Sequence, residues 1–188
     1  MLEIVKKSIL AGILIGLGVI INLNMEIPVI GPLLFSFGLI TIIFMKLFLF
    51  TGKVGYIISD ANITALLLVI ILIFNFVGIA ATIALYASAN QNFVDIITAA
   101  ATTKFSKSAI TLFINACFCG ALIHFAVKNK QGIITMFAIM IFILIGAEHC
   151  IADFPYLLFN FSWINVLKLL GIVIGNSIGA IVVEELSE

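Results

Sequence analysis

Long apolar runs leave this chain few ways to fold. Six segments consist almost entirely of hydrophobic residues, at about 8–23, 30–59, 63–87, 108–127, 132–152 and 163–183. About 20 such residues carry a helix across a bilayer. Only 10% of the residues are charged, against about 25% in a soluble domain, so polar side chains are too few to cover a surface in water. The sequence therefore predicts an all-α integral membrane protein, a single domain over residues 1–188 with six transmembrane helices.

The residue types also exclude several classes of function. All nine basic residues are lysines, so no guanidinium is present for bidentate phosphate binding, and nucleic acid is not an expected partner. No zinc-protease or phosphate-loop motif occurs, and Cys150 adjoins His149 but points away from it on a helix. The cysteines lie in apolar surroundings typical of packing residues. We therefore predict that the chain is not an enzyme and uses neither a metal nor another cofactor.

Lysines near the segment ends predict the orientation, because lysine gathers on the cytoplasmic side of a membrane. With the amino terminus inside, Lys104 and Lys107 fall on the outer side. A larger group falls on the inner side: Lys6, Lys7, Lys46, Lys53, Lys128 and Lys130. This distribution predicts a multi-pass protein of the cell (inner or plasma) membrane with both termini in the cytoplasm.

The two halves of the chain resemble each other. Lys7-Ser8 opens the first segment, and Lys107-Ser108 opens the fourth, 100 residues later. Asn75-Phe-Val-Gly78 lies in the third segment, and Asn176-Ser-Ile-Gly179 lies in the sixth, 101 residues later. Three spans in each half give the halves opposite orientations, the 3+3 inverted repeat of many transporters. The predicted repeat units are residues 1–87 and 108–188, joined by a connector at residues 88–107.

Each half also contains an interruption. Thr51-Gly52 breaks the second segment, and the stretch Gly146–Asp153, which closes the fifth, lies about 100 residues further on. An interrupted helix survives in a membrane only beside a cavity or packed protein. In inverted-repeat transporters such breaks meet near mid-membrane and form the substrate site. We therefore predict that helices 2 and 5 are broken and that their breaks form the functional site.

His149 is the candidate pore residue. An ionisable side chain inside a membrane segment marks a functional site, and histidine changes charge near neutral pH. The structural alternative is a neutral histidine that donates to a backbone carbonyl. Adjacent helical residues point about 100° apart, so Glu148 is expected to have a supporting role, accepting hydrogen bonds from the broken segment or from Thr51.

Other polar residues have structural interpretations. Asn75 and Asn176 occupy matching places in the two halves and are expected to hold the broken segments. Asp153 precedes Pro155 by two residues and is expected at a helix end at the lipid surface. His124 is expected at the membrane interface.

These motifs resemble those of the formate/nitrite transporter family. The family carries Gly-Phe-Glu-His-Ser/Cys-Val/Ile-Ala-Asn in its fifth helix, and this chain has Gly146-Ala-Glu-His-Cys-Ile-Ala-Asp153. Leu49-Phe-Thr-Gly52 matches the family's Leu-Phe/Tyr-Thr-Gly break in the second helix. Asn75-Phe-Val-Gly78 and Gly175-Asn-Ser-Ile-Gly179 match motifs of the third and sixth helices. The matches fall in order over four of the six segments, and the chain is identified as a short member of this family.

The resemblance implies an aquaporin-like fold and a homopentamer with one pore in each subunit. The family's pore histidine maps to His149 and its loop threonine to Thr51. Its fourth-helix asparagine maps to Asn115, for which the sequence leaves lumen lining and interhelix bonding equally open. The apolar constrictions would match Leu39 and Phe50 on one side, and Phe35 and Phe142 nearer the other. The chain departs from the family pattern at Ala147, Asp153, Lys46 and Lys53.

Members of the family pass small monovalent anions or their conjugate acids, namely formate, nitrite, hydrosulfide and lactate. The resemblance therefore implies a channel or transporter for the anions of weak acids, with lipid as its surroundings. Two alternatives stay open. One is a channel for neutral solutes such as water, glycerol or ammonia, although the Asn-Pro-Ala pair and the arginine filter of such channels are absent. The other is a degenerate relative that does not conduct.

Overall fold

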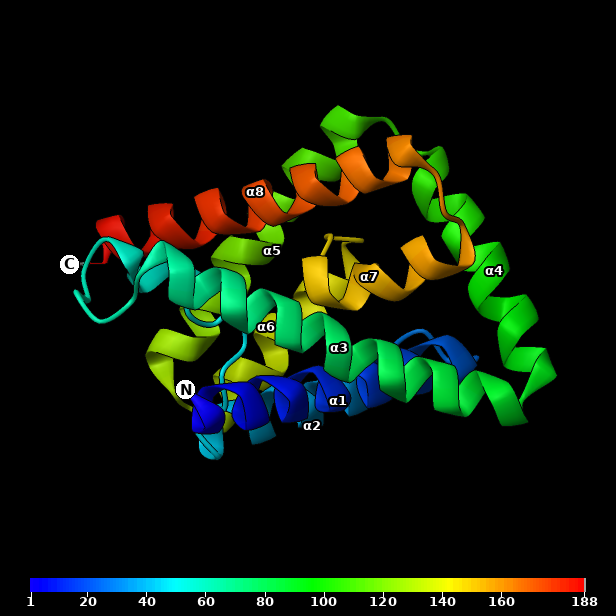
Figure 1. The fold of residues 1–188 in the computed structure, drawn as a ribbon, viewed down its shortest axis with the longest axis horizontal. Coiled ribbons are helices and arrows are strands. Elements are labelled where there is room, and N and C mark those ends of the chain that lie inside the picture. Colours follow the sequence, from blue (N-terminus) through cyan, green and yellow to red (C-terminus); the bar gives the residue numbers. More distant parts are fainter. Residues whose placement is uncertain (188) are drawn as a thin grey trace.

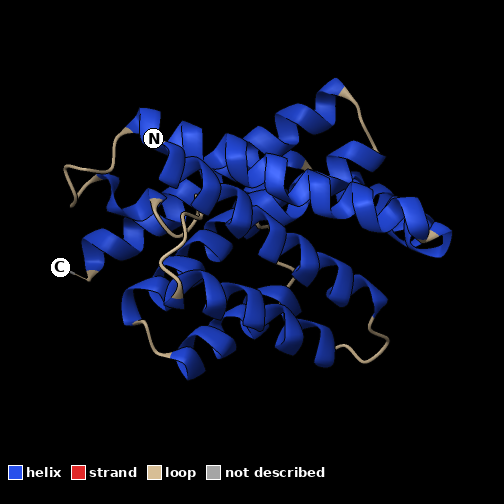
Figure 2. Ribbon diagram, turned by 60° about the horizontal axis from the view of Figure 1, so that its bottom comes forward, coloured by secondary structure: helices blue, strands red, loops and turns tan. Residues whose placement is uncertain are grey.

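The computed structural model describes residues 1–187, and all of the regular structure in this range is helical. The elements in chain order are α1 (Leu2–Asn24), α2 (Ile30–Phe44), η1 (Val54–Ile57), α3 (Ala65–Ala89), α4 (Gln91–Ser106), α5 (Ala109–Asn129), α6 (Gly132–Leu144), α7 (Cys150–Phe159) and α8 (Trp163–Leu186). Figure 1 shows that the start of α1 and the end of α8 lie at the same end of the molecule. The helices and their connecting loops are drawn from a second direction in Figure 2.

Four helices, α1, α3, α5 and α8, are each long and apolar enough to cross a membrane. Many of their large apolar side chains face outward, including Leu66 in α3 and Leu167 in α8. The prediction of an all-α chain is therefore confirmed for the described residues, and these four helices have the length and composition of membrane spans. The shorter helices α2, α6 and α7 are also apolar but do not reach the length of a full span.

Glycines bring the long helices together in two matching pairs. In the first half, a Cβ added to Gly12 or to Gly78 would overlap the backbone of the neighbouring helix where α1 crosses α3. In the second half, Gly120 and Gly179 make the same close approach where α5 crosses α8. Without a hydrophobic driving force in lipid, such small residues let helices gain packing energy by close contact. The two tightly packed pairs, α1 with α3 and α5 with α8, frame the rest of the molecule.

The helix α2 ends within the second apolar segment. The N–H of Leu47 donates to the carbonyl of Ile42 (2.9 Å), and the N–H of Lys46 donates to that of Ile43 (3.1 Å). Lys46 has a left-handed backbone with φ of +52°, so the helix closes in a Schellman motif. The chain then turns through Thr51 before the short helix η1 begins.

The helix α6 ends in the same way in the other half. The N–H of Ala147 donates to Phe142 (2.9 Å), and the N–H of Gly146 donates to Ile143 (3.0 Å). Gly146 is left-handed, with φ of +70°, and it lies 100 residues after Lys46. Both interruptions are therefore helix ends of the same local geometry, and the second leads directly into α7.

Candidate functional site

Asn75 holds the first break. From α3, its side-chain oxygen accepts the N–H of Phe50 (2.9 Å). Its amide nitrogen donates to the carbonyls of Phe48 and of Ser8 in α1, both at 2.8 Å. The asparagine is fully buried, so it satisfies three backbone groups that would otherwise lack a partner away from water.

Asn176 makes the matching contacts at the second break. From α8, its side-chain oxygen accepts the N–H of Cys150 (2.9 Å), and its amide nitrogen donates to the carbonyls of Glu148 and Ala116, both at 2.8 Å. Its partners in the break lie 100 residues after those of Asn75. Ala116, in α5, makes the contact that Ser8 makes in α1 but lies 108 residues later, so Ser108, the match in the sequence, is not the structural counterpart of Ser8. Each buried asparagine thus links one break to both helices of a glycine-packed pair.

Replacing either asparagine with alanine is expected to destabilise the protein by about 2–3 kcal/mol, because buried backbone groups then lose their partners. The Asn75→Ala and Asn176→Ala variants are expected to lose similar amounts, since their contacts correspond. Thermal unfolding of the purified variants in detergent measures the effect. The matched control is Asn92→Ala, on the exposed surface of α4. Equal stability of all three variants would contradict the role of the asparagines.

The two breaks meet through a side-chain hydrogen bond. Thr51 Oγ1 lies 2.8 Å from His149 Nε2, and both residues are almost completely buried. His149 also caps α7, because its Nδ1 accepts the N–H of Ala152 (3.2 Å). Since Nδ1 accepts, the neutral imidazole carries its proton on Nε2 and donates it to Thr51. The threonine hydroxyl hydrogen is then free to be donated to another acceptor.

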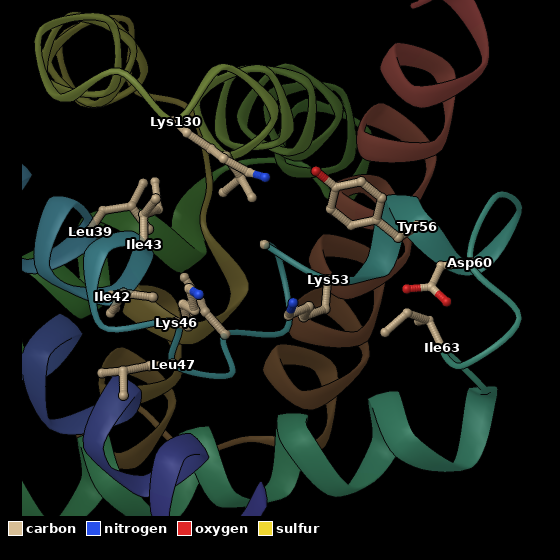
Figure 3. Close-up of a pocket in the computed structure, with 13 residues that line it drawn as sticks. Leu39, Ile42, Ile43, Lys46, Leu47, Lys53, Tyr56, Asp60, Ile63 and Lys130 are labelled. Carbon is tan, nitrogen blue, oxygen red and sulfur yellow. The ribbon is translucent and has the colours of Figure 1, made fainter. Parts of the chain in front are cut away.

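A large cavity opens at the end of the molecule that carries both termini. It has a volume of about 400 Å³, and we call it the terminal cavity. Its wall includes Leu39 from α2, Lys53 from the first break and Tyr56 from η1 (Figure 3). Gly52, the residue after Thr51, also lines it, so the cavity reaches the first break.

A smaller cavity lies on the other side of the breaks. This far cavity has a volume of about 160 Å³ and is lined by His149, Phe35, Phe142 and Lys104, among others. The Phe35 and Phe142 rings meet edge to face, with centroids 6.1 Å apart. Leu39 lines the terminal cavity, and the constricting role of these three residues stays a prediction. Phe50 is buried and is not among the residues that line either cavity.

Asn115 lies beside the second break without lining either of the two cavities. Its side-chain nitrogen donates to the carbonyl of Gly146 (3.2 Å), and its own carbonyl accepts the N–H of Glu148 (3.3 Å). These contacts join α5 to the second break, and the other interpretation that the sequence left open, lumen lining, stays a prediction.

Glu148 has partners that the sequence did not suggest. Its carboxylate binds the ammonium groups of Lys104 and of Lys107, the latter at 2.8 Å. Lys104 also pairs with Asp153 at 2.8 Å. Burial acts to lower the pKa of Lys104, but the two carboxylates outweigh it and hold this pKa above its ordinary value. The sequence predicted that Glu148 accepts hydrogen bonds from the broken segment or from Thr51; the partners found for its carboxylate are the two lysines, and Thr51 pairs with His149.

One further expectation, for Asp153, was wrong, and the one that places His124 at the membrane interface stays a prediction. Asp153 is only 3% exposed, and Pro155 lies inside α7 instead of ending a helix, so the carboxylate faces Lys104 and not the lipid surface. His124 is completely buried and lies 2.7 Å from a carboxylate oxygen of Glu184. Each of these buried side chains has a partner from a distant segment, Lys104 for Asp153 and Glu184 for His124.

Lys104 is a residue of the site that was not predicted from the sequence. The buried face of α4 is formed by Phe93, Ile97, Ala101 and Phe105, at the spacing of one helical face. Lys104 follows Ala101 by three residues, so it lies on the same side of α4 as the buried residues. That spacing was the signal in the sequence that could have identified Lys104.

Comparisons with known proteins agree with this geometry. The family model described as "Formate/nitrite transporter" matches residues 1–186. A solved "FNT family ion channel" is similar with a TM-score of 0.80 and 21% identity, over 99% of this chain and 88% of the other. A "pentameric formate channel with formate bound" is similar with a TM-score of 0.77 and 18% identity, over 98% and 93%. No curated protein sequence matches the chain significantly. At these identities the two structures establish the fold.

Proposed function

Because this chain belongs to the formate/nitrite transporter family, we propose that it is a membrane channel for small monovalent anions of weak acids, such as formate, nitrite or hydrosulfide. The observation that carries the proposal is the buried Thr51–His149 pair, which lies between two cavities at opposite sides of the breaks. A solute that passes from one cavity to the other meets this pair.

The proposed mechanism lowers the cost of moving a charge through an apolar passage. A bare ion taken from water into a low-dielectric interior costs on the order of 20 kcal/mol in the idealised case. His149 donates from Nε2 to Thr51, and the hydroxyl of Thr51 in turn donates to the anion. In this proposal the imidazole first takes up a proton from water of the far cavity at Nδ1, which releases the N–H of Ala152. The imidazolium then passes its Nε2 proton to Thr51, and the hydroxyl proton of Thr51 passes to the anion. The imidazole is neutral again, and the anion has become its neutral acid, which removes most of the barrier. Flux then rises as the pH on the outer side falls.

The other predicted residues have supporting roles in this proposal. Leu39 and Phe50 narrow the passage on one side of the pair, and Phe35 and Phe142 narrow it on the other. Asn115 steadies the second break through its bond to Gly146, where it can also meet a solute in transit. We further propose that Asn75 and Asn176 hold the breaks, and that Glu148 fixes the lysines at the far cavity.

The family also supports a proposal for the assembly. Each half contributes three spans in inverted orientation, with α2 and η1 together forming the second span and α6 and α7 the fifth. One of the two similar structures is a pentameric formate channel, and a homopentamer with one pore per subunit is proposed here. The lysine distribution supports a cell-membrane location with both termini in the cytoplasm.

Flux into liposomes tests the proposed function. Purified protein is reconstituted, and uptake of formate, nitrite or hydrosulfide is followed from the internal pH and from osmotic swelling, with protein-free liposomes as the control. At least one of these anions is expected to enter faster than in the control, and its rate is expected to increase at acidic outside pH. Swelling in glycerol without uptake of any anion would favour a channel for neutral solutes. Absence of all flux would favour a non-conducting relative.

A further inference from the structure

The terminal cavity contains an unusual concentration of positive charge. Lys46, Lys53 and Lys130 all line it, and Asp60 is the acidic residue in its wall. Figure 3 shows the three lysines around the open centre, with Lys46 and Lys53 on the connection between α2 and η1 and Lys130 on the connection between α5 and α6. Three positive charges against one negative charge leave the wall with a net charge of +2.

These lysines are not neutralised by ion pairs. Within residues 1–187, no carboxylate lies within ion-pair distance of Lys46, Lys53 or Lys130. The carboxylate of Asp60 instead accepts the backbone and side-chain N–H groups of Asn62, both at 2.9 Å. At the far cavity the arrangement is the opposite, because Lys104 and Lys107 bind Glu148 and Asp153. Unpaired positive charge is therefore specific to one of the two cavities.

The backbone gives a second, independent observation. Lys46 and Lys130 have φ values of +52° and +56°, and they are the two residues other than glycine with positive φ among the described residues. A side chain makes this conformation unfavourable, and glycine is the usual solution. At the position that corresponds to Lys46 in the other half, the chain has glycine, Gly146, with φ of +70°. The two strained non-glycine positions are thus both lysines, and both face the same cavity.

Strained residues of this kind persist where the surrounding structure requires them, and they cluster at functional sites. We propose that the terminal cavity is a binding site for a divalent oxyanion of the sulfate or hydrogen phosphate class, whose occupancy blocks the pore from that side. Lysine ammoniums bind such anions as point charges, and a doubly charged anion complements a wall of net charge +2. The volume of about 400 Å³ accommodates an anion of five heavy atoms together with water. Blocking rests on the proposed channel function, whereas binding does not.

Binding is tested first, with sulfate as the probe and purified protein in a neutral detergent. Isothermal titration is expected to give saturable binding that weakens as sodium chloride increases. The double variant Lys46→Gly/Lys130→Gly is expected to weaken it at least tenfold. Glycine fits both positions without strain, so this variant is expected to fold. The matched control is Lys6→Gln, an exposed lysine of α1 outside the cavity, which should bind sulfate like the wild type. Equal binding by the wild type and the double variant would overturn the proposal.

Blocking is tested separately in planar bilayers that carry formate current. Sulfate is expected to reduce the current from the side of the terminal cavity only, and the double variant is expected to lose this sidedness. Bilayers of neutral and of anionic lipid distinguish a free oxyanion from a lipid phosphate, because a headgroup in the cavity would compete with sulfate only in anionic lipid. Equal block from both sides would contradict the proposal. If no current flows but sulfate binding depends on the two lysines, the channel function fails while the binding site stands.

Discussion

Replacing His149 with asparagine is expected to lower anion flux into liposomes at acidic outside pH by about 10- to 100-fold. Asparagine is a favourable residue at a helix N-terminus, so the cap that His149 provides for Ala152 is retained. The variant cannot relay a proton, and the charge-assisted hydrogen bond from Thr51 to the passing anion is weakened, because the imidazole no longer orients the threonine hydroxyl. Hydrogen bonds to charged groups contribute about 1.5–3 kcal/mol. Because about 1.4 kcal/mol corresponds to a tenfold change, a loss of this size lowers the flux by about 10- to 100-fold. The dependence of flux on outside pH should disappear as well.

The chain provides a matched control for this experiment, because it contains a second buried histidine. His124 lies against Glu184 and Tyr56, away from the Thr51–His149 pair. The His124→Gln variant keeps a hydrogen-bonding side chain and is expected to retain wild-type flux and pH response. Thr51→Val preserves shape but removes the hydroxyl, and it should reduce flux about tenfold. Normal pH-dependent flux in His149→Asn would sink the proton-relay mechanism.

The breaks were predictable because their residues recur at a nearly constant offset. Thr51-Gly52 and the stretch from Gly146 each interrupt an apolar run, and a membrane tolerates such a break only where protein covers it. Asn75 and Asn176 follow the breaks at matching distances and are amides in the middle of apolar helices. Polar residues and glycines that interrupt apolar runs, at matching positions in the two halves, therefore identified the stretches that the fold brings together.

The ionic contacts were not predictable in the same way. Lys104 lies more than 40 residues before Glu148, and its pairing depends on how the connector helix α4 packs against α7. Asp153 was interpreted from Pro155 beside it, but a proline does not by itself end a helix whose neighbours supply the missing contacts. Local sequence indicates where a charge is costly, whereas its partner is determined by tertiary packing.

Replacing Lys104 with methionine is expected to destabilise the protein by about 3–5 kcal/mol, because breaking a buried ion pair leaves an uncompensated buried charge. Glu148 keeps Lys107 as a partner, whereas Asp153 loses the cation with which it pairs. The effect is measured as thermal unfolding in detergent. The side chain of Lys104 is 16% exposed and that of Lys107 is 36% exposed, so Lys107→Met is the matched control and should cost no more than about 1 kcal/mol.

The source of the instability can then be separated from lost packing by a second substitution. Adding Asp153→Asn to Lys104→Met removes the unpaired carboxylate with little change in shape. If the buried charge is the cause, this double variant should recover most of the lost stability, although it has one ionic group fewer. If packing of the lysine stem is the cause, the double variant should be no more stable than the single one. Recovery would also explain how asparagine serves at this position in the family pattern, since a neutral amide there requires no cation.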